Sequence, residues 1–332
     1  MVGLGSLNLD VFYRLPRPRL LVEAGWPVVP GGEVFLPDEE MPALEEFLSR
    51  HGQYLGVDGG GSAANTVYAL SRLGFSTAFL GAVGQDEAGD YLRRSLAPVD
   101  TRGVKTVPGR TGTAFIVLDE AGERTILVFP QANARLAEAG LEPEAVGLGP
   151  KATDRPRFLH LSSFVRAEAR AVQEQLVASL PPEVEVSLDP GEIYARQGLA
   201  ALERLLPRSR LVFITQAELE LLLPGQALEA AARKLLDLGP EIVVVKRGAG
   251  GSVIFTRWEQ IAVPAVPVTA VDTTGAGDVY DAGFLAGLLL GLPLASCGRL
   301  AAAAAAQSVT GRGREAYPDA GFLRRWQQEG SI

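Results

Sequence analysis

The sequence predicts a three-layer, Rossmann-like α/β fold: a mostly parallel central sheet flanked by helices, with a small additional β-sheet as a lid. From about residue 157 onward, helical stretches alternate with short apolar segments, at 158–161, 184–188, 211–214 and 242–246. This alternation is typical of a parallel sheet whose crossover helices cover both faces. A hairpin pattern at 113–119 and 124–129, with turn residues at 120–123, breaks the alternation and indicates the second sheet.

The composition is that of a globular protein without a basic surface. Of its 332 residues 47% are hydrophobic and 21% charged, which supports one core spanning residues 1–332 as a single domain. The formal net charge is −8, and we expect neither a nucleic acid nor a membrane surface as partner. The lone Cys297 excludes an intramolecular disulfide. Together with the lack of a signal peptide or a long apolar span, this predicts a cytoplasmic protein.

The opening segment, residues 2–15, is apolar and predicts one buried strand. Asn8 and Asp10 lie two residues apart near its far end, so that on a strand they point to the same face. The functional interpretation is that this polar pair binds a polyhydroxyl ligand. A strand end with local caps is the alternative.

The next elements are less regular. After a stretch rich in proline and glycine, residues 38–50 predict a short helix with Asp38 as its N-cap. A glycine-rich turn is expected at 57–61, and a helix at 62–74. Because these pieces and the hairpin do not fit the α/β alternation, we expect the lid to form from segments near 10–58 and 100–130.

The string DTTGAGD at residues 272–278, followed by an expected helix at 279–290, is the strongest functional pattern. Its glycines allow a tight turn whose N–H groups point one way, and the positive end of a helix dipole follows at once. Such a turn can stabilise the charge on a phosphoryl group in transfer. Asp278 at its mouth can accept a proton from an attacking hydroxyl. A lone Gly-x-Gly-Asp is more often a simple helix start, but the full string favours the site.

Two further glycine-rich segments are candidate binding loops. The first, GGGSAAN at 59–65, lets a ligand approach the backbone, and Asn65 offers a donor and an acceptor. The second, RGAGG at 247–251, follows a buried strand that ends at Lys246, where a nucleotide pocket can form at the carboxyl end of a sheet. A flexible connector and an ordinary hairpin are the alternatives for the two segments.

In their order along nearly the whole chain, these segments resemble the ribokinase-like carbohydrate kinases, also called the PfkB family. Residues 60–89 are similar to the first signature of that family, and residues 272–283 to the second, which is highly specific. The resemblance implies a kinase that uses ATP and Mg²⁺, with Asp278 as catalytic base. It also implies roles for several further residues: Gly275, Ala276 and Gly277 as the anion hole; Asn8, Asp10, Gly60, Gly61 and Asn65 for the acceptor; Gly248 and Gly251 for the nucleotide; Asp272 and Thr274 for a potassium ion, as in many members.

Three features depart from ribokinase itself. The Asn-x-x-Glu motif that organises magnesium in the family is TQAE here, so Thr215 replaces the asparagine and Glu218 is retained. We expect Glu218 to contact magnesium through water. Ribokinases often have lysine at the position of Ser62 and glutamate near Ser162, and both losses argue against ribose. The long stretch between residues 10 and 59 is similar to the adenosine-kinase branch.

The sequence thus predicts transfer of the γ-phosphate of ATP to a hydroxyl, preferentially a primary one, of a small sugar or sugar acid. A nucleoside kinase is the alternative, since aromatic lid residues would stack on a base; the candidates are Phe12, Phe35, Tyr54 and Phe115. A Rossmann oxidoreductase is disfavoured because GLGSLN at 3–8 lacks the third glycine of that fingerprint, and the sequence has no P-loop string. An apolar lid edge would pair with a second copy, so we expect a homodimer.

Overall fold

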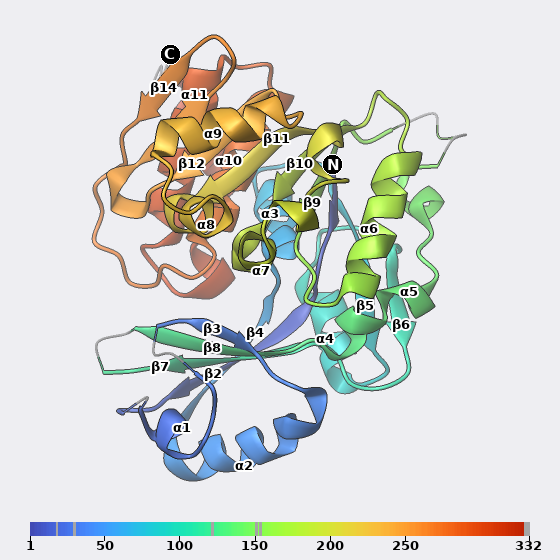
Figure 1. Cartoon of the computed structure of the whole chain (residues 1–332), viewed down its shortest axis with the longest axis vertical. Helices are drawn as coiled ribbons and strands as arrows, with labels where there is room; N and C mark the ends of the chain where they lie inside the picture. The colour runs from blue at the N-terminus through green and yellow to red at the C-terminus, as the bar shows by residue number, and fades with distance from the viewer. Residues whose placement is uncertain (18, 29–30, 121–122, 150–151, 153–154, 329–332) are drawn as a thin grey trace.

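The computed structural model contains two sheets (Figure 1) and describes residues 1–332 except 18, 29–30, 121–122, 150–151, 153–154 and 329–332. The large sheet has the order β14-β13-β12-β11-β10-β9-β1-β5-β6. Its strands are β1 (Val2–Leu4), β5 (Ala78–Gly84), β6 (Val104–Val107), β9 (Phe158–Ser162), β10 (Glu185–Asp189), β11 (Ser209–Thr215), β12 (Ile242–Lys246), β13 (Ser252–Phe255) and β14 (Gln260–Val263). The small sheet has the order β3-β8-β7-β2-β4. Its strands are β2 (Asn8–Arg14), β3 (Glu33–Phe35), β4 (Gln53–Gly60), β7 (Thr113–Leu118) and β8 (Arg124–Phe129).

The large sheet is parallel from β6 to β12, and β13 and β14 extend it as an antiparallel edge. The four apolar segments predicted after residue 157 are β9 to β12, which lie next to one another. Every residue of β9 and β12 is buried, as expected for strands covered by helices on both faces. The α/β prediction is confirmed.

Helices cover both faces of the large sheet. On one face lie α5 (Leu136–Ala139), α6 (Ala167–Ser179), α7 (Gly191–Gln197), α8 (Gln216–Leu222) and α9 (Leu228–Asp237). On the other lie α3 (Ser62–Arg72), α4 (Glu87–Ser95), α10 (Ala276–Leu289), α11 (Leu294–Ser308) and α12 (Ala320–Gln328). Among the described residues, no helix is both long and apolar enough to cross a membrane.

The small sheet lies apart from the large one, below it in Figure 1, and has its own apolar core. The expected hairpin is β7 and β8, which pair antiparallel; residues 121–122 of its turn lie outside the described residues. Helices α1 (Arg19–Glu23) and α2 (Met41–His51) cover the outer face, where Val11 and Phe115 are buried. Because side chains alternate along β2, Asp10 and Phe12 lie on the opposite face, toward the large sheet.

The opening segment forms two strands, so the prediction of one strand over 2–15 is wrong. Strand β1 ends at Leu4 in the large sheet, and β2 begins at Asn8 in the small sheet. The chain leaves β1 at Gly5, where a Cβ would lie 2.2 Å from Ser162 Oγ, so that no larger residue fits. Apolar patterning does not reveal this change of sheet, because apolar residues continue from β1 through Leu7 into β2.

The helix expected at 38–50 begins later than predicted, and Asp38 is not its N-cap. Residues Asp38–Glu40 form a 3₁₀ turn, and α2 starts at Met41 with Pro42 in its first turn. Pro42 has no N–H to donate to the carbonyl of Asp38, which prevents an α-helical turn there. The Asp38 side chain instead accepts a hydrogen bond from Gln131 N at 3.2 Å.

The glycine-rich segment expected as a turn at 57–61 is mostly strand. Gly59 and Gly60 pair with β2 as the last residues of β4, and α3 begins at Ser62. Gly61 alone makes the turn between them, with a φ of 107° that favours glycine. The last strand of the small sheet is therefore followed directly by α3, a helix that packs on the large sheet.

The chain crosses between the two layers at one place, which we call the seam: residues Ser6, Leu7, Gly61, Gly112 and Asn133. A Cβ at Gly61 would lie 2.1 Å from Ser6 O, and one at Gly112 would lie 2.0 Å from Asn133 Nδ2. The Asn133 side chain accepts from Leu7 N at 2.9 Å and donates to Leu7 O at 3.0 Å. These close contacts hold the crossings against one another.

Candidate active site

The glycine turn before Asp278 forms the start of α10. The helix begins at Ala276, three residues earlier than expected, and Gly275 precedes it with a φ of 73°. The first intrahelical bond is donated by Val279 N to Gly275 O at 3.0 Å. The N–H groups of Gly277 and Asp278 come before that bond and have no partner within the helix. The predicted anion-hole residues thus lie together at a helix N-terminus.

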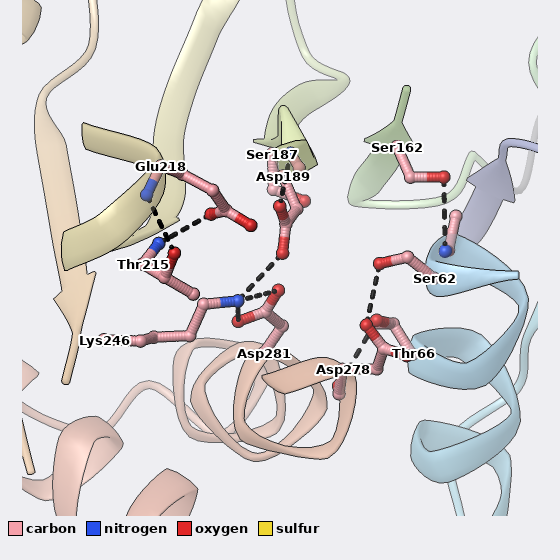
Figure 2. Close-up of polar contacts among 12 residues, drawn as sticks. Ser62, Thr66, Ser162, Ser187, Asp189, Thr215, Glu218, Lys246, Asp278 and Asp281 are labelled. Atoms are coloured by element: carbon pink, nitrogen blue, oxygen red, sulfur yellow. Dashed lines mark hydrogen bonds and ion pairs between the residues drawn. The ribbon is translucent and has the colours of Figure 1, made fainter. Parts of the chain in front are cut away.

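Two side chains of α3 hold the Asp278 carboxylate. Ser62 Oγ donates to Oδ1 at 2.7 Å (Figure 2). Asn65 Nδ2 donates to Oδ2 at 2.8 Å. Thr66 Oγ1 also donates to the Asp278 carbonyl at 3.2 Å. Burial raises the pKa of Asp278 to about 6, although the hydrogen bonds from Asn65 and Ser62 act to lower it. The carboxylate is thus oriented and titrates just below neutral pH.

Both the nitrogen and the oxygen of the Asn65 side-chain amide form hydrogen bonds with other protein side chains. Its Nδ2 donates to Asp278, and its Oδ1 accepts from Nε and Nη2 of Arg314 at 3.1 and 2.9 Å. Sequence reasoning assigned Asn65 to the acceptor and missed Arg314, which is 8% exposed. No local pattern marks Arg314, because it lies in a short polar segment 249 residues from Asn65.

Asp10 lies on the inner face of the small sheet, against the backbone of Gly60. A Cβ at Gly60 would lie 2.1 Å from Asp10 Oδ1, so that this contact requires glycine. Burial raises the pKa of Asp10 to about 8, with the Arg314 guanidinium opposing the rise and the Asp58 carboxylate adding to it. The structure thus brings Asp10 and Gly60 together, as predicted.

Asn8 is tied to the seam. Its Oδ1 accepts a hydrogen bond from Asn133 Nδ2 at 2.8 Å. Gly61, predicted to contact the acceptor, packs on Ser6 in the same place. Both residues support the crossing between the two sheets, and Asn133 is a structural partner that sequence reasoning missed.

Lys246, predicted to contact the nucleotide, is ion-paired with two carboxylates (Figure 2). Its Nζ lies 2.8 Å from Asp189 Oδ2 and 3.1 Å from Asp281 Oδ1. Burial alone would lower the pKa of Lys246, but these two carboxylates hold it well above its usual range. A Cβ at Gly277 would lie 3.4 Å from Nζ, so the ammonium lies directly behind the first turn of α10.

Glu218 and Thr215 form a capping box at the start of α8. Thr215 Oγ1 accepts from Glu218 N at 3.1 Å, and Glu218 Oε2 accepts from Thr215 N at 2.7 Å. Burial raises the pKa of Glu218, and the nearby Asp189 charge adds to the rise. In the described part of the chain, no group of three or more Asp, Glu, His or Cys side chains is placed to hold a metal ion.

A cavity of about 600 Å³ opens at the carboxyl ends of β11 and β12. Thr215, Lys246, Arg247 and Gly248 line the side nearest the strands. Gly251 is not among its lining residues; a Cβ there would lie 2.2 Å from Val263 O, so Gly251 serves the tight turn into β13. The cavity lies where ligands bind in open parallel sheets.

The loop before the anion hole contacts both the small sheet and the C-terminal segment. Asp272 Oδ1 accepts from Thr274 N at 2.9 Å, and Asp272 Oδ2 from Gly313 N at 3.4 Å. Thr274 Oγ1 accepts a hydrogen bond from Arg124 Nη1, on β8, at 2.7 Å. The small sheet therefore reaches across to the residue that precedes Gly275.

Comparisons with known proteins agree with this architecture. Residues 36–319 match the family described as pfkB family carbohydrate kinase. An uncharacterised sugar kinase from Archaeoglobus fulgidus is 36% identical over 75% of this chain and 98% of its own length. A nucleoside kinase from Methanothermobacter thermautotrophicus is 31% identical over 82% of this chain and 87% of its own. The crystal structure of adenosine kinase from Sinorhizobium meliloti superposes with a TM-score of 0.85 at 23% identity, over 99% and 98% of the two chains.

The fold is therefore ribokinase-like. The family match and the related kinases make the chain a phosphotransferase that uses an alcohol group as acceptor. The chain belongs to the pfkB family of carbohydrate kinases. The expectation drawn from the two glycine-rich signatures is confirmed.

Proposed function

We propose that this protein transfers the γ-phosphate of ATP to a hydroxyl, preferentially a primary one, of a small neutral sugar, with Asp278 as the general base. The observation that carries the proposal is the Asp278 carboxylate, partly buried at the N-terminus of α10 and held by two donors of α3. With a pKa raised to about 6, it is mostly ionised at neutral pH and basic enough to take the proton of an attacking hydroxyl.

The anion hole is the second part of the mechanism. Gly275, Ala276 and Gly277 receive the phosphoryl group, whose growing negative charge is stabilised by the free N–H groups and the helix dipole. The Lys246 ammonium lies behind Gly277, where its charge is balanced by Asp189 and Asp281 and supports the first turn of the helix. Gly248 and the cavity beside it hold the nucleotide. ATP supplies the phosphoryl group when it is bound.

The small sheet acts as a lid over the acceptor, within a single catalytic domain. Asp10 on its inner face accepts hydrogen bonds from acceptor hydroxyls, beside the backbone of Gly60. The contact of Arg124 with Thr274 supports this role, because it connects the lid to the loop of the anion hole. A closed lid excludes water, which would otherwise compete with the acceptor for the phosphoryl group.

The charges around the acceptor favour a neutral molecule over a sugar acid. Asp10 lies near the carboxylates of Asp58 and Asp278, and Arg314 is the cation that opposes them. The hydrogen bonds of Arg314 go to Asn65, so that it offers little to an anionic substrate. A carboxylate or phosphate on the acceptor would meet net repulsion here.

A nucleoside acceptor is the second candidate. Phe12 and Phe35 lie on the face of the small sheet opposite its apolar core, the same face as Asp10, where they could stack on a base. Phe115 is buried in the core of the small sheet and packs on Phe129, so it is unsuited to this role. Tyr54 is 56% exposed at the sheet edge.

The residues fit magnesium better than potassium. Mg²⁺ commonly keeps several waters and binds substrate phosphates, so Glu218 would contact it through water. For potassium, Asp272 offers a carboxylate, but the Thr274 hydroxyl already accepts from the cationic Arg124, which would compete with an ion. We therefore propose that Mg²⁺ binds near Glu218 and that Thr274 is unsuited to bind potassium.

A homodimer through the small sheet is a further part of the proposal. Strand β4 is an edge strand, and Tyr54 and Val57 on it are 56% and 41% exposed. Pairing of this edge with a second copy would cover them. Light scattering after size-exclusion chromatography would test the dimer: a mass twice that of the chain supports it, and the mass of one chain contradicts it.

We also propose that the protein acts in the cytoplasm, where ATP is available.

An acceptor panel tests the proposed function. ADP formation is measured with ATP and Mg²⁺ against pentoses, hexoses, nucleosides, a sugar acid and a sugar phosphate, with a matched series in EDTA. We expect magnesium-dependent turnover with a neutral sugar or nucleoside. Turnover restricted to an anionic acceptor would contradict the charge argument. No acceptor-dependent ADP formation anywhere in the panel would overturn the function.

A further inference from the structure

Arg314 is buried although it comes from a polar segment near the C-terminal end of the chain. It lies in the short 3₁₀ turn Gly313–Ala316 and is 8% exposed, with its guanidinium carbon 4.9 Å from the centre of the Tyr68 ring. Its Nη1 is buried and has no hydrogen-bond partner in the described part of the chain. Burying a charge without a close carboxylate is costly, so the contacts that Arg314 does make require a functional explanation.

The main contact of Arg314 is with the side-chain oxygen of Asn65, to which it donates twice, at 3.1 and 2.9 Å. An asparagine amide can rotate by half a turn and exchange its donor and acceptor. A guanidinium can only donate, so it fixes Oδ1 on its own side. Nδ2 must then point the other way, where it donates to Asp278 at 2.8 Å.

We infer that Arg314 is a positioning residue for phosphoryl transfer: it fixes the Asn65 amide so that the Asp278 carboxylate is oriented toward the acceptor hydroxyl. The inference rests on the proposed function and adds to it a residue without contact to the reacting atoms. Without Arg314, the amide could rotate and place its oxygen against the carboxylate, which would repel and displace it.

The charge of Arg314 also acts on Asp10. Burial raises the pKa of that carboxyl to about 8, Arg314 lowers it, and the carboxylates of Asp58, Asp278 and Glu33 raise it further. Among these surrounding groups Arg314 is the cation. Its removal would keep Asp10 protonated to higher pH and reduce its strength as an acceptor of hydrogen bonds from the substrate.

Arg314→Gln is the primary test, with Arg312→Gln as the matched control, because Arg312 is exposed in the same loop. We expect kcat of Arg314→Gln to fall by about 10- to 100-fold, the size that results when a catalytic group is displaced slightly. KM for ATP should stay unchanged, and the acidic limb of the kcat/KM profile should move to higher pH as Asp278 loses a fixed donor. The control should match the wild type in all three. An unchanged kcat in Arg314→Gln would overturn the inference.

A double-mutant cycle shows whether Arg314 acts through Asn65. If it does, Arg314→Gln should reduce kcat little in an Asn65→Ala background, where there is no amide to orient. Losses that multiply in the double variant would overturn the inference. Arg314→Lys, which retains the charge and a donor, should recover most of kcat. If kcat instead follows thermal stability across the Gln and Lys variants, the role is structural and the inference is wrong.

A measurement independent of turnover separates this inference from the proposed function. Because the pKa of Asp10 is raised by folding, its stabilising contribution is present at low pH and is lost as pH rises toward 8. Arg314→Gln should steepen this loss, so that its Tm deficit relative to wild type is larger at pH 9 than at pH 6. An equal deficit at both values would overturn the electrostatic role, whether or not an acceptor has been found.

Discussion

Helix α10 carries two aspartates three residues apart, Asp278 partly buried and Asp281 fully buried, and their surroundings differ. Asp278 meets the neutral donors Ser62 and Asn65, whereas Asp281 meets the ammonium of Lys246. Burial raises the pKa of both carboxyls. In Asp278 the hydrogen bonds partly offset the burial and leave the pKa at about 6, while that of Asp281 stays well above its usual range.

The difference teaches that the depth of burial and the neighbouring groups together decide what a carboxylate can do, because Asp281 is fully buried beside the second carboxylate of Asp189, whereas Asp278 is partly buried. A carboxylate held by neutral donors keeps its orientation and can still exchange a proton near neutral pH. One that shares a lysine with a second carboxylate, as Asp281 does with Asp189, contributes to a fixed charge cluster instead. The group formed by Asp278, Ser62 and Asn65 suits proton transfer. The cluster formed by Lys246, Asp189 and Asp281 stabilises the helix that carries Asp278.

The largest effect is expected from a substitution of Asp278, the proposed base. Asp278→Asn keeps the shape of the side chain but cannot take a proton, so we expect kcat to fall by about 10²- to 10⁴-fold or more. Nucleotide binding should persist. Because the raised pKa makes the ionised carboxylate unfavourable above pH 6, Tm at pH 8 should stay the same or rise. Near-normal turnover would exclude Asp278 as base.

A substitution in the cluster of Lys246, Asp189 and Asp281 should lower the stability of the fold. Lys246→Met leaves Asp189 and Asp281 buried without their cation, and we expect a loss of about 3–5 kcal/mol in the free energy of unfolding. The loss should be larger at pH 8 than at pH 5, since protonation removes the uncompensated charge. Lys234→Met, at an exposed position on α9, is the control. Denaturant unfolding with equal midpoints for the two variants would show that the cluster is not structural.

Asp10→Ala tests whether the small sheet holds the acceptor. Above its pKa of about 8, Asp10 is a carboxylate, and a hydrogen bond from a hydroxyl to it is worth about 1.5–3 kcal/mol, so KM for the acceptor at pH 9 should rise by about 10-fold or more. KM for ATP serves as the internal control and should barely move. A variant that loses affinity for ATP but keeps its affinity for the acceptor would show that the two ends of the site are assigned backwards.

The smallest expected effect is that of Ser62→Ala. Removal of this hydroxyl takes one of the hydrogen bonds that lower the pKa of Asp278, so the pKa should rise by about one unit. Activity falls as pH drops through that pKa, because the base must be ionised. The acidic limb of kcat/KM should therefore move to higher pH, with kcat at pH 9 nearly normal. A limb that stays in place would mean that Ser62 does not control the proton affinity of Asp278.

The anion-hole turn could be found in the sequence because its residues are contiguous and the φ of 73° at Gly275 requires glycine. The partners of Asp278 could not, since Ser62 lies 216 residues away and only packing of α3 on α10 brings it there. The same holds for Arg314. The strand ending at Lys246 was predictable from its apolar pattern, but that pattern does not show that Asp189 and Asp281 would take up the ammonium.

The seam at Ser6, Leu7, Gly61, Gly112 and Asn133 has a consequence for evolution and for engineering. Since the crossings between the two layers pack against one another there, the small sheet can be treated as a cassette with its ends gathered in one spot. A cassette from a relative with a different acceptor could be joined at these glycines if it keeps an arginine to contact Thr274, next to the anion hole. The specificity of a kinase built in this way can diverge while its phosphoryl-transfer machinery stays constant.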